Sequence, residues 1–182
     1  DMIFLAHCLK KNNFFIDCGA NVGTYSIIAS KVVGAKSIAF EPSAETQTKL
    51  NRNIELNNID EKVDVRKVVL SDKIEKLYFT NYGSTDDVLN KVSLNQTNTN
   101  DNILINTSTL DNEINISEDF ILKIDVEGYE GKLINGAKKI LDNKNLVALI
   151  IEVNQMISDY GRENREDLHN KITSYGFIPV DY

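Results

Sequence analysis

The sequence predicts an α/β domain with a doubly wound, mostly parallel sheet. Short apolar runs alternate with helix-like stretches along the chain, and a length of 182 residues fits one compact domain. Buried strands that alternate with helices form parallel sheets, and right-handed crossovers place the helices on both faces. Such a sheet binds its ligand at the carboxyl ends of its strands, so we look for the site there.

Local signals set the expected elements. Pro42 ends the second apolar run, and Ser43 is a suitable N-cap for the helix that follows. In that helix Leu50, Ile54 and Leu56 are candidates for the buried face. The expected strands are 14–17, 37–41, 63–70, 76–80, 120–125 and 146–153, and the expected helices are 23–33, 44–57, 129–141 and 164–175.

Two segments depart from this alternation. Residues 81–118 are rich in Asn, Thr, Ser and Asp, with one apolar run at 103–105. We expect a partly irregular excursion there that faces the substrate; a plain surface loop is the alternative. Residues 1–13 are expected to form an N-terminal helical segment, so the whole chain, 1–182, is interpreted as a single domain.

The composition restricts the partners. The formal net charge of −7, without a long Lys/Arg run, argues against nucleic acid. No apolar run approaches the roughly 20 residues of a membrane span. No secretory signal is visible, although a start at Asp1 leaves an upstream segment open. Cys8 and Cys18 are too few for a disulfide scaffold, which favours buried thiols and a cytoplasmic location.

The first motif is Asp17-Cys18-Gly19-Ala20-Asn21-Val22-Gly23, between the first strand and the first helix. Gly19 and Gly23 permit a tight turn and the close approach of a ligand to the backbone. The helix N-terminus that follows offers free N–H groups to an anion. That anion is either a dinucleotide pyrophosphate or the carboxylate of a methionine moiety. Asn21 replaces the second glycine of G-x-G-x-x-G, and no third glycine follows in register.

Two further motifs lie at the ends of later strands. Glu41 ends the second strand, 18 residues after Gly23, where an acid would accept hydrogen bonds from both hydroxyls of a ribose. Asp125 ends a buried strand, and Glu127 follows it in the loop. Lys123 is unusual in an apolar strand; strand alternation places it on the same face as Asp125, so we expect an ion pair.

The segments D-C-G-A-N-V-G-T-Y-S, A-F-E-P-S, L-x-x-N-I-x-L-N-N, V-V-L-S-D, L-K-I-D-V-E-G-Y-E and I-N-G-A, in this order, resemble the FkbM-type methyltransferase domain over about 14–152. The resemblance implies a class I, Rossmann-like methyltransferase fold that uses S-adenosylmethionine. It also implies O-methylation of a hydroxyl on a sugar, glycan or secondary metabolite, so the expected partner is a small-molecule or carbohydrate substrate.

Residue by residue, the resemblance implies Asp17, Gly19, Asn21 and Gly23 around the methionine part, Glu41 on the ribose, Ser71 and Asp72 near the adenine, and Asp125 and Glu127 beside the transferred methyl. Cys18 stands where the family commonly has valine. The usual fold closes with a β-hairpin after the last helix, whereas this chain stops soon after 177–180. The C-terminal edge of the sheet is therefore expected to be truncated or abbreviated.

Three carboxylates are candidates for the base that takes the acceptor's proton: Asp125, Glu127 and Glu152. Neither His7 nor His169 lies in a site motif, although the segment that carries His7 is long enough to lean over the cofactor. A metal-assisted alternative would hold Mg²⁺ with Asp125, Glu152 and Asn154, but the interpretation without a metal is favoured. Two other classes stay open: a nicotinamide-dependent oxidoreductase and a non-catalytic cofactor-binding relative.

Overall fold

The computed structural model describes residues 1–80, 91–93, 102–153 and 165–181. Its strands are β1 Phe14–Cys18, β2 Lys36–Phe40, β3 Val63–Arg66, β4 Val69–Leu70, β5 Lys76–Thr80, β6 Lys91–Ser93, β7 Asn102–Ser108, β8 Phe120–Ile124 and β9 Leu146–Ile151. Its helices are α1 Met2–Cys8, α2 Thr24–Ile27, the π-helix η1 Ile28–Val33, α3 Ala44–Asn57, α4 Leu110–Glu113, α5 Glu130–Asn135, α6 Lys138–Leu141 and α7 Arg165–Ser174.

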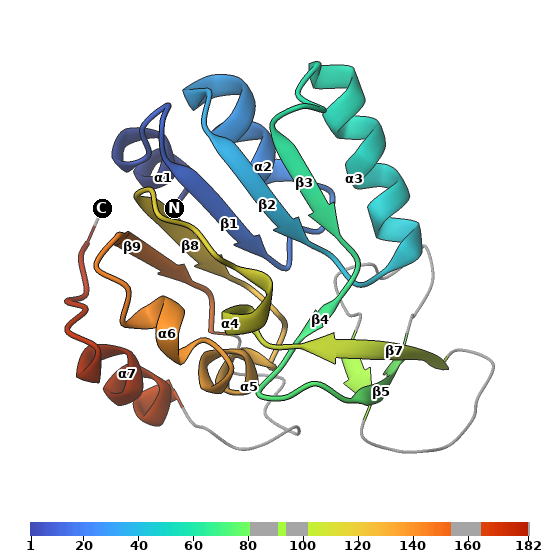
Figure 1. Ribbon diagram of the computed structural model, residues 1–182, viewed down its shortest axis with the longest axis vertical. Coiled ribbons are helices and arrows are strands. Elements are labelled where there is room, and N and C mark those ends of the chain that lie inside the picture. The colour runs from blue at the N-terminus through green and yellow to red at the C-terminus, as the bar shows by residue number, and fades with distance from the viewer. Residues whose placement is uncertain (81–90, 94–101, 154–164, 182) are drawn as a thin grey trace.

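The main sheet has the strand order β3-β2-β1-β8-β9, and every neighbouring pair in it is parallel. The chain moves from β1 to β2 on one side and later returns to β8 on the other. The strand order therefore reverses beside β1, and the carboxyl ends of β1, β2 and β8 meet at one edge (Figure 1). This topology confirms the predicted doubly wound α/β fold.

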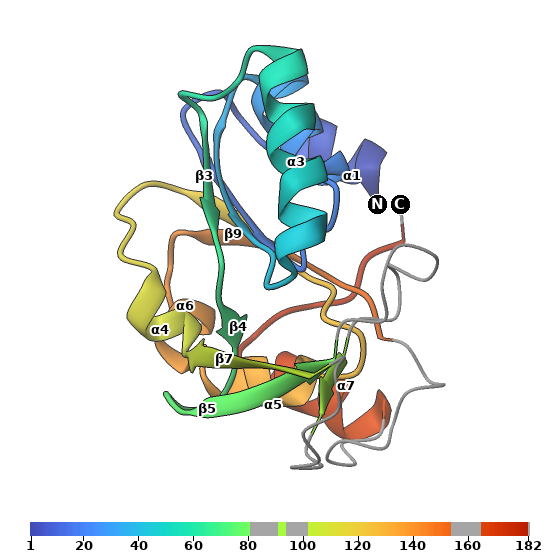
Figure 2. The ribbon, with the colours of Figure 1, turned by 90° about the vertical axis from the view of Figure 1, so that its right-hand side faces the viewer.

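Helices cover both faces of the main sheet (Figure 2). On one face α1, η1 and α3 bury Leu5, Ala29 and Leu50. On the other face, helices α4 to α7 pack apolar side chains such as Leu133 and Leu168 against the strands. Both faces are therefore occupied by apolar contacts, and the edge formed by the strand ends remains for polar groups.

The helix α3 shows how local signals set its ends. Ser43 is the N-cap, and its Oγ accepts a hydrogen bond from the Thr46 amide at 3.3 Å. Leu50 and Ile54 are buried as predicted, but Leu56 is 69% exposed, so its assignment to the buried face was wrong. Leu56 lies on the outer side of the helix, since helical spacing separates it from the face that holds the other two residues.

Three predicted elements are divided in the structure. The run 63–70 splits into β3 and β4, because Val69 and Leu70 pair with β7 in a second sheet. The helix predicted over 129–141 breaks at Gly136, whose Cα lies so close to the Ser71 carbonyl that a Cβ would overlap it. The helix predicted over 23–33 continues from α2 into the π-helix η1.

The second sheet has the order β4-β7-β5-β6 and lies beyond the carboxyl ends of β1, β2 and β3 (Figures 1 and 2). The apolar run 103–105 lies inside β7, so this part of the 81–118 excursion is a regular strand rather than irregular. Residues 81–90 and 94–101 lie outside the described residues. A substrate-facing role for the excursion therefore stays a prediction.

The strand β9, the most apolar run in the sequence, is an edge strand. Val147 is 59% exposed, and no described residue pairs with the outer side of β9. Residues 177–181 follow α7 without forming a strand. The strand predicted over 146–153 is confirmed as β9, which ends at Ile151. None of the helices within the described ranges is long and apolar enough to cross a membrane.

Candidate active site

The Gly19 turn connects the ends of three strands. The amides of Gly19 and Ala20 both donate to the Phe40 carbonyl at 3.0 Å, which ties the turn to the end of β2. On its other side, a Cβ at Gly19 would overlap the backbone carbonyl of Asp125 after β8. With φ of +82° at Gly19 and +91° at Gly23, the turn also needs left-handed backbone at both positions. The glycines are thus required by the fold as well as by any ligand.

Glu41 faces this turn with both carboxylate oxygens held. Oε2 accepts the Asn21 amide at 3.1 Å, and Oε1 accepts the Ser43 amide at 2.8 Å. The residue is only 7% exposed. Each of the two carboxylate oxygens thus accepts a backbone amide from the segment that surrounds the turn. The carboxylate is thereby oriented before any ligand arrives.

Asp17 lies beneath the turn and is 1% exposed. Its Oδ2 accepts the Ser26 hydroxyl at 2.7 Å, while its Oδ1 has no hydrogen-bond partner among the described residues and lies 3.9 Å from Lys123 Nζ. Burial raises the pKa of the Asp17 carboxyl above its usual value, and the Lys123 ammonium and the Ser26 hydroxyl only partly oppose that effect. Ionisation of Asp17 in the folded state therefore costs free energy, and Lys123 and Ser26 offset part of that cost.

Lys123 joins the two acidic strand ends. It is 3% exposed, and its Nζ donates to Asp125 Oδ2 at 2.9 Å and lies 4.8 Å from the centre of the Tyr25 ring. Burial acts to lower the pKa of Lys123, but Asp17 and Asp125 outweigh it and the pKa is raised. The predicted ion pair is confirmed, and the structure adds Asp17 and Tyr25 to it.

The two remaining candidate bases lie beside this group. Glu127 is part-buried in the turn after β8, with an unusual left-handed φ of +48°. Glu152 follows β9, where its amide donates to the Ile124 carbonyl at 3.0 Å, and it is exposed. Burial raises the pKa of Tyr25, and the charges of Glu152 and Asp125 add to that rise. The phenol therefore lies within electrostatic reach of both acids.

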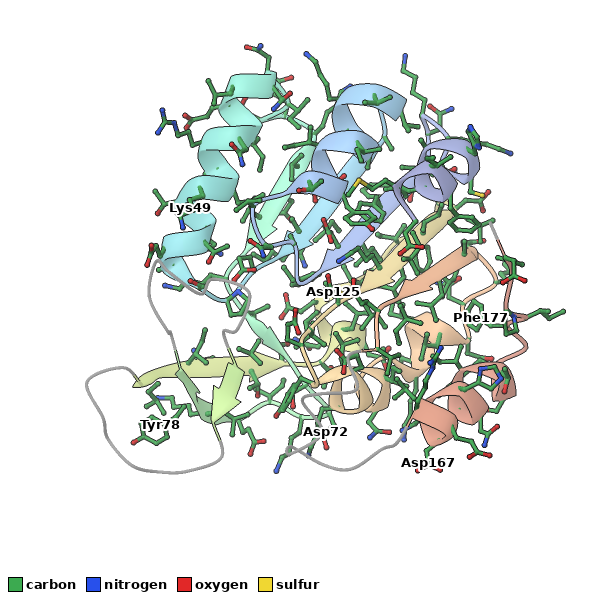
Figure 3. All side chains as sticks on the ribbon, turned by 180° about the vertical axis from the view of Figure 1, so that it is seen from behind. Lys49, Asp72, Tyr78, Asp125, Asp167 and Phe177 are labelled. Atoms are coloured by element: carbon green, nitrogen blue, oxygen red, sulfur yellow. The ribbon has the colours of Figure 1, made fainter. Side chains whose placement is uncertain are left out.

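Ser71 and Asp72 belong to a different contact group. Ser71 is fully buried and donates to Asp72 Oδ1 at 3.1 Å, and Lys132 Nζ of α5 lies 3.1 Å from Asp72 Oδ2. Burial acts to raise the pKa of Asp72, but the hydrogen bonds from Lys132 and Ser71 lower it overall. Figure 3 shows Asp125 near the centre of the molecule and Asp72 below it. The position of Ser71 and Asp72 near the adenine stays a prediction.

The two histidines lie outside this constellation, and the described residues show no metal-binding cluster. His7 is exposed on α1, which lies beside the start of β1 rather than at the strand ends (Figure 1), so it does not lean over the turn. His169 is exposed on α7. Among the described residues, no group of three His, Cys, Asp or Glu side chains could hold a metal ion. Asn154, a member of the metal-assisted alternative, lies outside the described residues.

Two residues of the site were missed by reasoning from sequence. These residues are Tyr25 and Ser26, and none of the predicted binding or catalytic roles falls on them. Both stand in the first turn of α2, directly after Gly23. A polar residue at the start of a helix that opens on a ligand edge was the available signal.

The Ser26–Asp17 hydrogen bond leads to a stability prediction. Ser26→Ala is expected to lower the free energy of unfolding by about 1.5–3 kcal/mol, because a buried carboxylate loses its donor. The loss should be smaller at acidic pH, because the pKa of Asp17, already raised in the folded wild type, rises further in the variant. The charge-dependent part of the loss develops as pH rises from the folded-state pKa of the wild type to the higher folded-state pKa of the variant. Urea unfolding at pH 4.5 and 7.5 measures both effects.

Ser30→Ala is the matched control, since Ser30 is also buried and shares a 2.8 Å hydrogen bond with the hydroxyl of Ser37. Its neutral pair should cost about 1 kcal/mol at both pH values. Equal losses for the two variants would mean that the Asp17 bond has no charged character.

The fold and the strand-end motifs define a Rossmann-like methyltransferase domain. The methyltransferase FkbM domain family matches residues 17–179, and the chain belongs to this family. The crystal structure of methyltransferase FkbM from Methylobacillus flagellatus KT superposes with a TM-score of 0.62 and 18% identity, covering 92% of this chain and 38% of that one. At this identity the likeness shows the fold.

Two further relatives are more distant or shorter matches. Methyltransferase sdnD of Sordaria araneosa is 40% identical over 62 residues, which are 31% of this chain and 24% of sdnD. A SAM-dependent methyltransferase from Thiobacillus denitrificans, solved with S-adenosyl-L-homocysteine, has 13% identity and a TM-score of 0.37 over 41% of this chain and 31% of its own. The matched regions thus span well under half of each of these proteins.

Proposed function

We propose that this chain binds S-adenosylmethionine at the carboxyl edge of the main sheet and transfers its methyl group to a hydroxyl oxygen of a small-molecule or carbohydrate acceptor. The observation that carries the proposal is the Glu41 carboxylate, held by two backbone amides opposite the Gly19 turn. Family membership favours a methyl donor over a nicotinamide cofactor as the ligand of this edge.

In this proposal the Glu41 carboxylate accepts hydrogen bonds from the two ribose hydroxyls. The backbone from Gly19 to Gly23 lies against the methionine part, directly before the start of α2. Asp17 and Asp125 place negative charge beneath the same turn, which suits a donor that carries a sulfonium cation.

The reaction that follows has simple requirements. The acceptor oxygen attacks the methyl carbon in line with the sulfur, the carbon–sulfur bond breaks, and the sulfonium becomes a neutral thioether. Holding the two reactants in this geometry can supply about 7–11 kcal/mol of the barrier. The hydroxyl proton passes to a carboxylate at the edge, with Asp125, Glu127 and Glu152 as the candidates, and such a base contributes roughly 10²–10⁴-fold.

The left-handed backbone at Glu127 supports its place among these bases. A glutamate gains nothing from positive φ, and strained residues that persist tend to serve a site. One oxygen of Asp125, Oδ2, accepts a hydrogen bond from the Lys123 ammonium. A Mg²⁺-assisted route through Asp125, Glu152 and Asn154 stays a second prediction, and its donor set is of the oxygen type that Mg²⁺ prefers.

Calorimetric titration with S-adenosylhomocysteine, run beside NAD⁺, tests the donor site. We expect micromolar binding of the homocysteine compound alone, weakened about 10–100-fold by Glu41→Gln, because the amide no longer offers two charged acceptors. Glu55→Gln, an exposed change on α3, is the control and should leave binding unchanged. Binding of NAD⁺ instead would favour the oxidoreductase alternative.

Turnover separates an enzyme from a non-catalytic relative. Transfer of a labelled methyl group from S-adenosylmethionine to members of a sugar and polyol panel, lost in Glu41→Gln, is the expected result. Donor binding without transfer to any hydroxyl, but with transfer to amines or thiols, would contradict the proposed O-methylation.

A further inference from the structure

The charge pattern beneath the Gly19 turn is one cation between two carboxylates. Lys123 Nζ lies 2.9 Å from Asp125 Oδ2 and 3.9 Å from Asp17 Oδ1. Asp17 is buried whereas Asp125 is part-buried, so it is the Asp17 carboxylate that stays ionised only while a cation stands beside it. Without that cation, Asp17 takes up a proton.

The other groups that face this cluster supply no second cation. Tyr25 covers the ammonium from α2, and Glu152 acts on Tyr25 from the end of β9. Cys18 follows Asp17 in β1, and burial together with the Asp17 charge raises the pKa of its thiol, so it stays neutral. Among the described contacts of the cluster, Lys123 is thus its single positive charge.

We propose that Lys123 is a positioning residue: its charge keeps the buried Asp17 ionised beneath the turn, and its contact with Oδ2 fixes the Asp125 carboxylate at the ligand edge. The charge part stands on the geometry alone. The ligand part rests on the proposed function, because it assumes that a sulfonium cation binds beside Asp125.

Thermal unfolding tests the charge part without any ligand. In Lys123→Met the Asp17 carboxyl takes up a proton in the folded state, because the ammonium is absent. In the unfolded chain the same carboxyl releases its proton at about pH 4. The Tm deficit relative to the wild type should therefore grow as pH rises from 5.5 to 8.5, by about 5 °C. Asp17→Asn/Lys123→Met removes the unpaired carboxylate as well and should recover most of the deficit and lose its pH dependence.

The control is Lys31→Met, an exposed lysine whose Nζ donates to the Asn57 carbonyl, with no expected pH-dependent change in Tm. A deficit in Lys123→Met that is the same at both pH values would overturn the charge part. So would a double variant that is less stable than the single one.

Titration calorimetry in two buffers of different ionisation enthalpy tests the ligand part. Wild type should bind S-adenosylmethionine at pH 7 with no net proton exchange. Lys123→Met should bind it about tenfold more weakly and release up to one proton. The proton is released because the bound sulfonium cation favours the ionised form of the Asp17 carboxyl. S-adenosylhomocysteine, which lacks that charge, should release fewer protons.

If Lys123→Met does not fold, the affinity is measured on Asp17→Asn/Lys123→Met instead. This double variant should keep a Tm near that of the wild type and still bind S-adenosylmethionine about tenfold more weakly. Unchanged affinity in both variants would show a purely structural role and overturn the ligand part. Absence of binding to the wild type would count against the proposed function, while the unfolding experiment would still decide the charge part.

Discussion

Gly19→Ala is expected to lower the free energy of unfolding by about 3–5 kcal/mol, the sum of an overlap and a backbone strain. The new Cβ would overlap the carbonyl oxygen of Asp125, and φ at Gly19 is +82°. The oxygen cannot easily withdraw, because the Asp125 amide donates to the Cys18 carbonyl at 3.0 Å and fixes that backbone. Urea unfolding at neutral pH measures the loss.

Gly176→Ala separates the two causes. Gly176 has nearly the same φ, +89°, but nothing lies within 4 Å of its Cβ position. Only the left-handed strain of about 1–2 kcal/mol should remain there. Equal losses at Gly19 and Gly176 would mean that the contact between the turn and the end of β8 carries no energy.

The strand ends that form the candidate site could be predicted because they depend on local order. Glu41 follows an apolar run and precedes Pro42, so its position at a carboxyl edge follows from the sequence and the parallel topology. The pairing of Lys123 with Asp125 needed only the alternation of one strand.

The contacts that sequence reasoning missed join distant segments. Asp17 lies beside Lys123 because β1 and β8 are paired in a register that places these residues opposite each other, more than 100 positions apart in the chain. Local patterning also could not show that Val69 and Leu70 leave the main sheet for β7, or that β9 is an edge. Long-range packing decides which strands pair, and an apolar strand has the same sequence pattern in either sheet.

The second large effect concerns the contact between Gly23 and α3. A Cβ at Gly23 would overlap Cδ1 of Leu50, and Leu50 is fully buried. Gly23→Ala should cost about 2–4 kcal/mol, from this overlap and from a φ of +91°. Leu50→Ala should cost about 2–5 kcal/mol through the cavity that it leaves.

The two changes together should cost about 1–2 kcal/mol less than their sum, because truncation of Leu50 removes the atom that the new Cβ would meet. Leu133→Ala is the control partner, since Leu133 is also fully buried but packs on the opposite face of the sheet. Combined with Gly23→Ala it should be additive within about 0.5 kcal/mol. Denaturant unfolding of the three single and two double variants measures both sums. A double-variant loss smaller than the sum with Leu50 alone would mean that α3 sets the position of the turn on which the donor is proposed to bind. Additivity in both pairs would mean that β2 and β8 alone hold the turn.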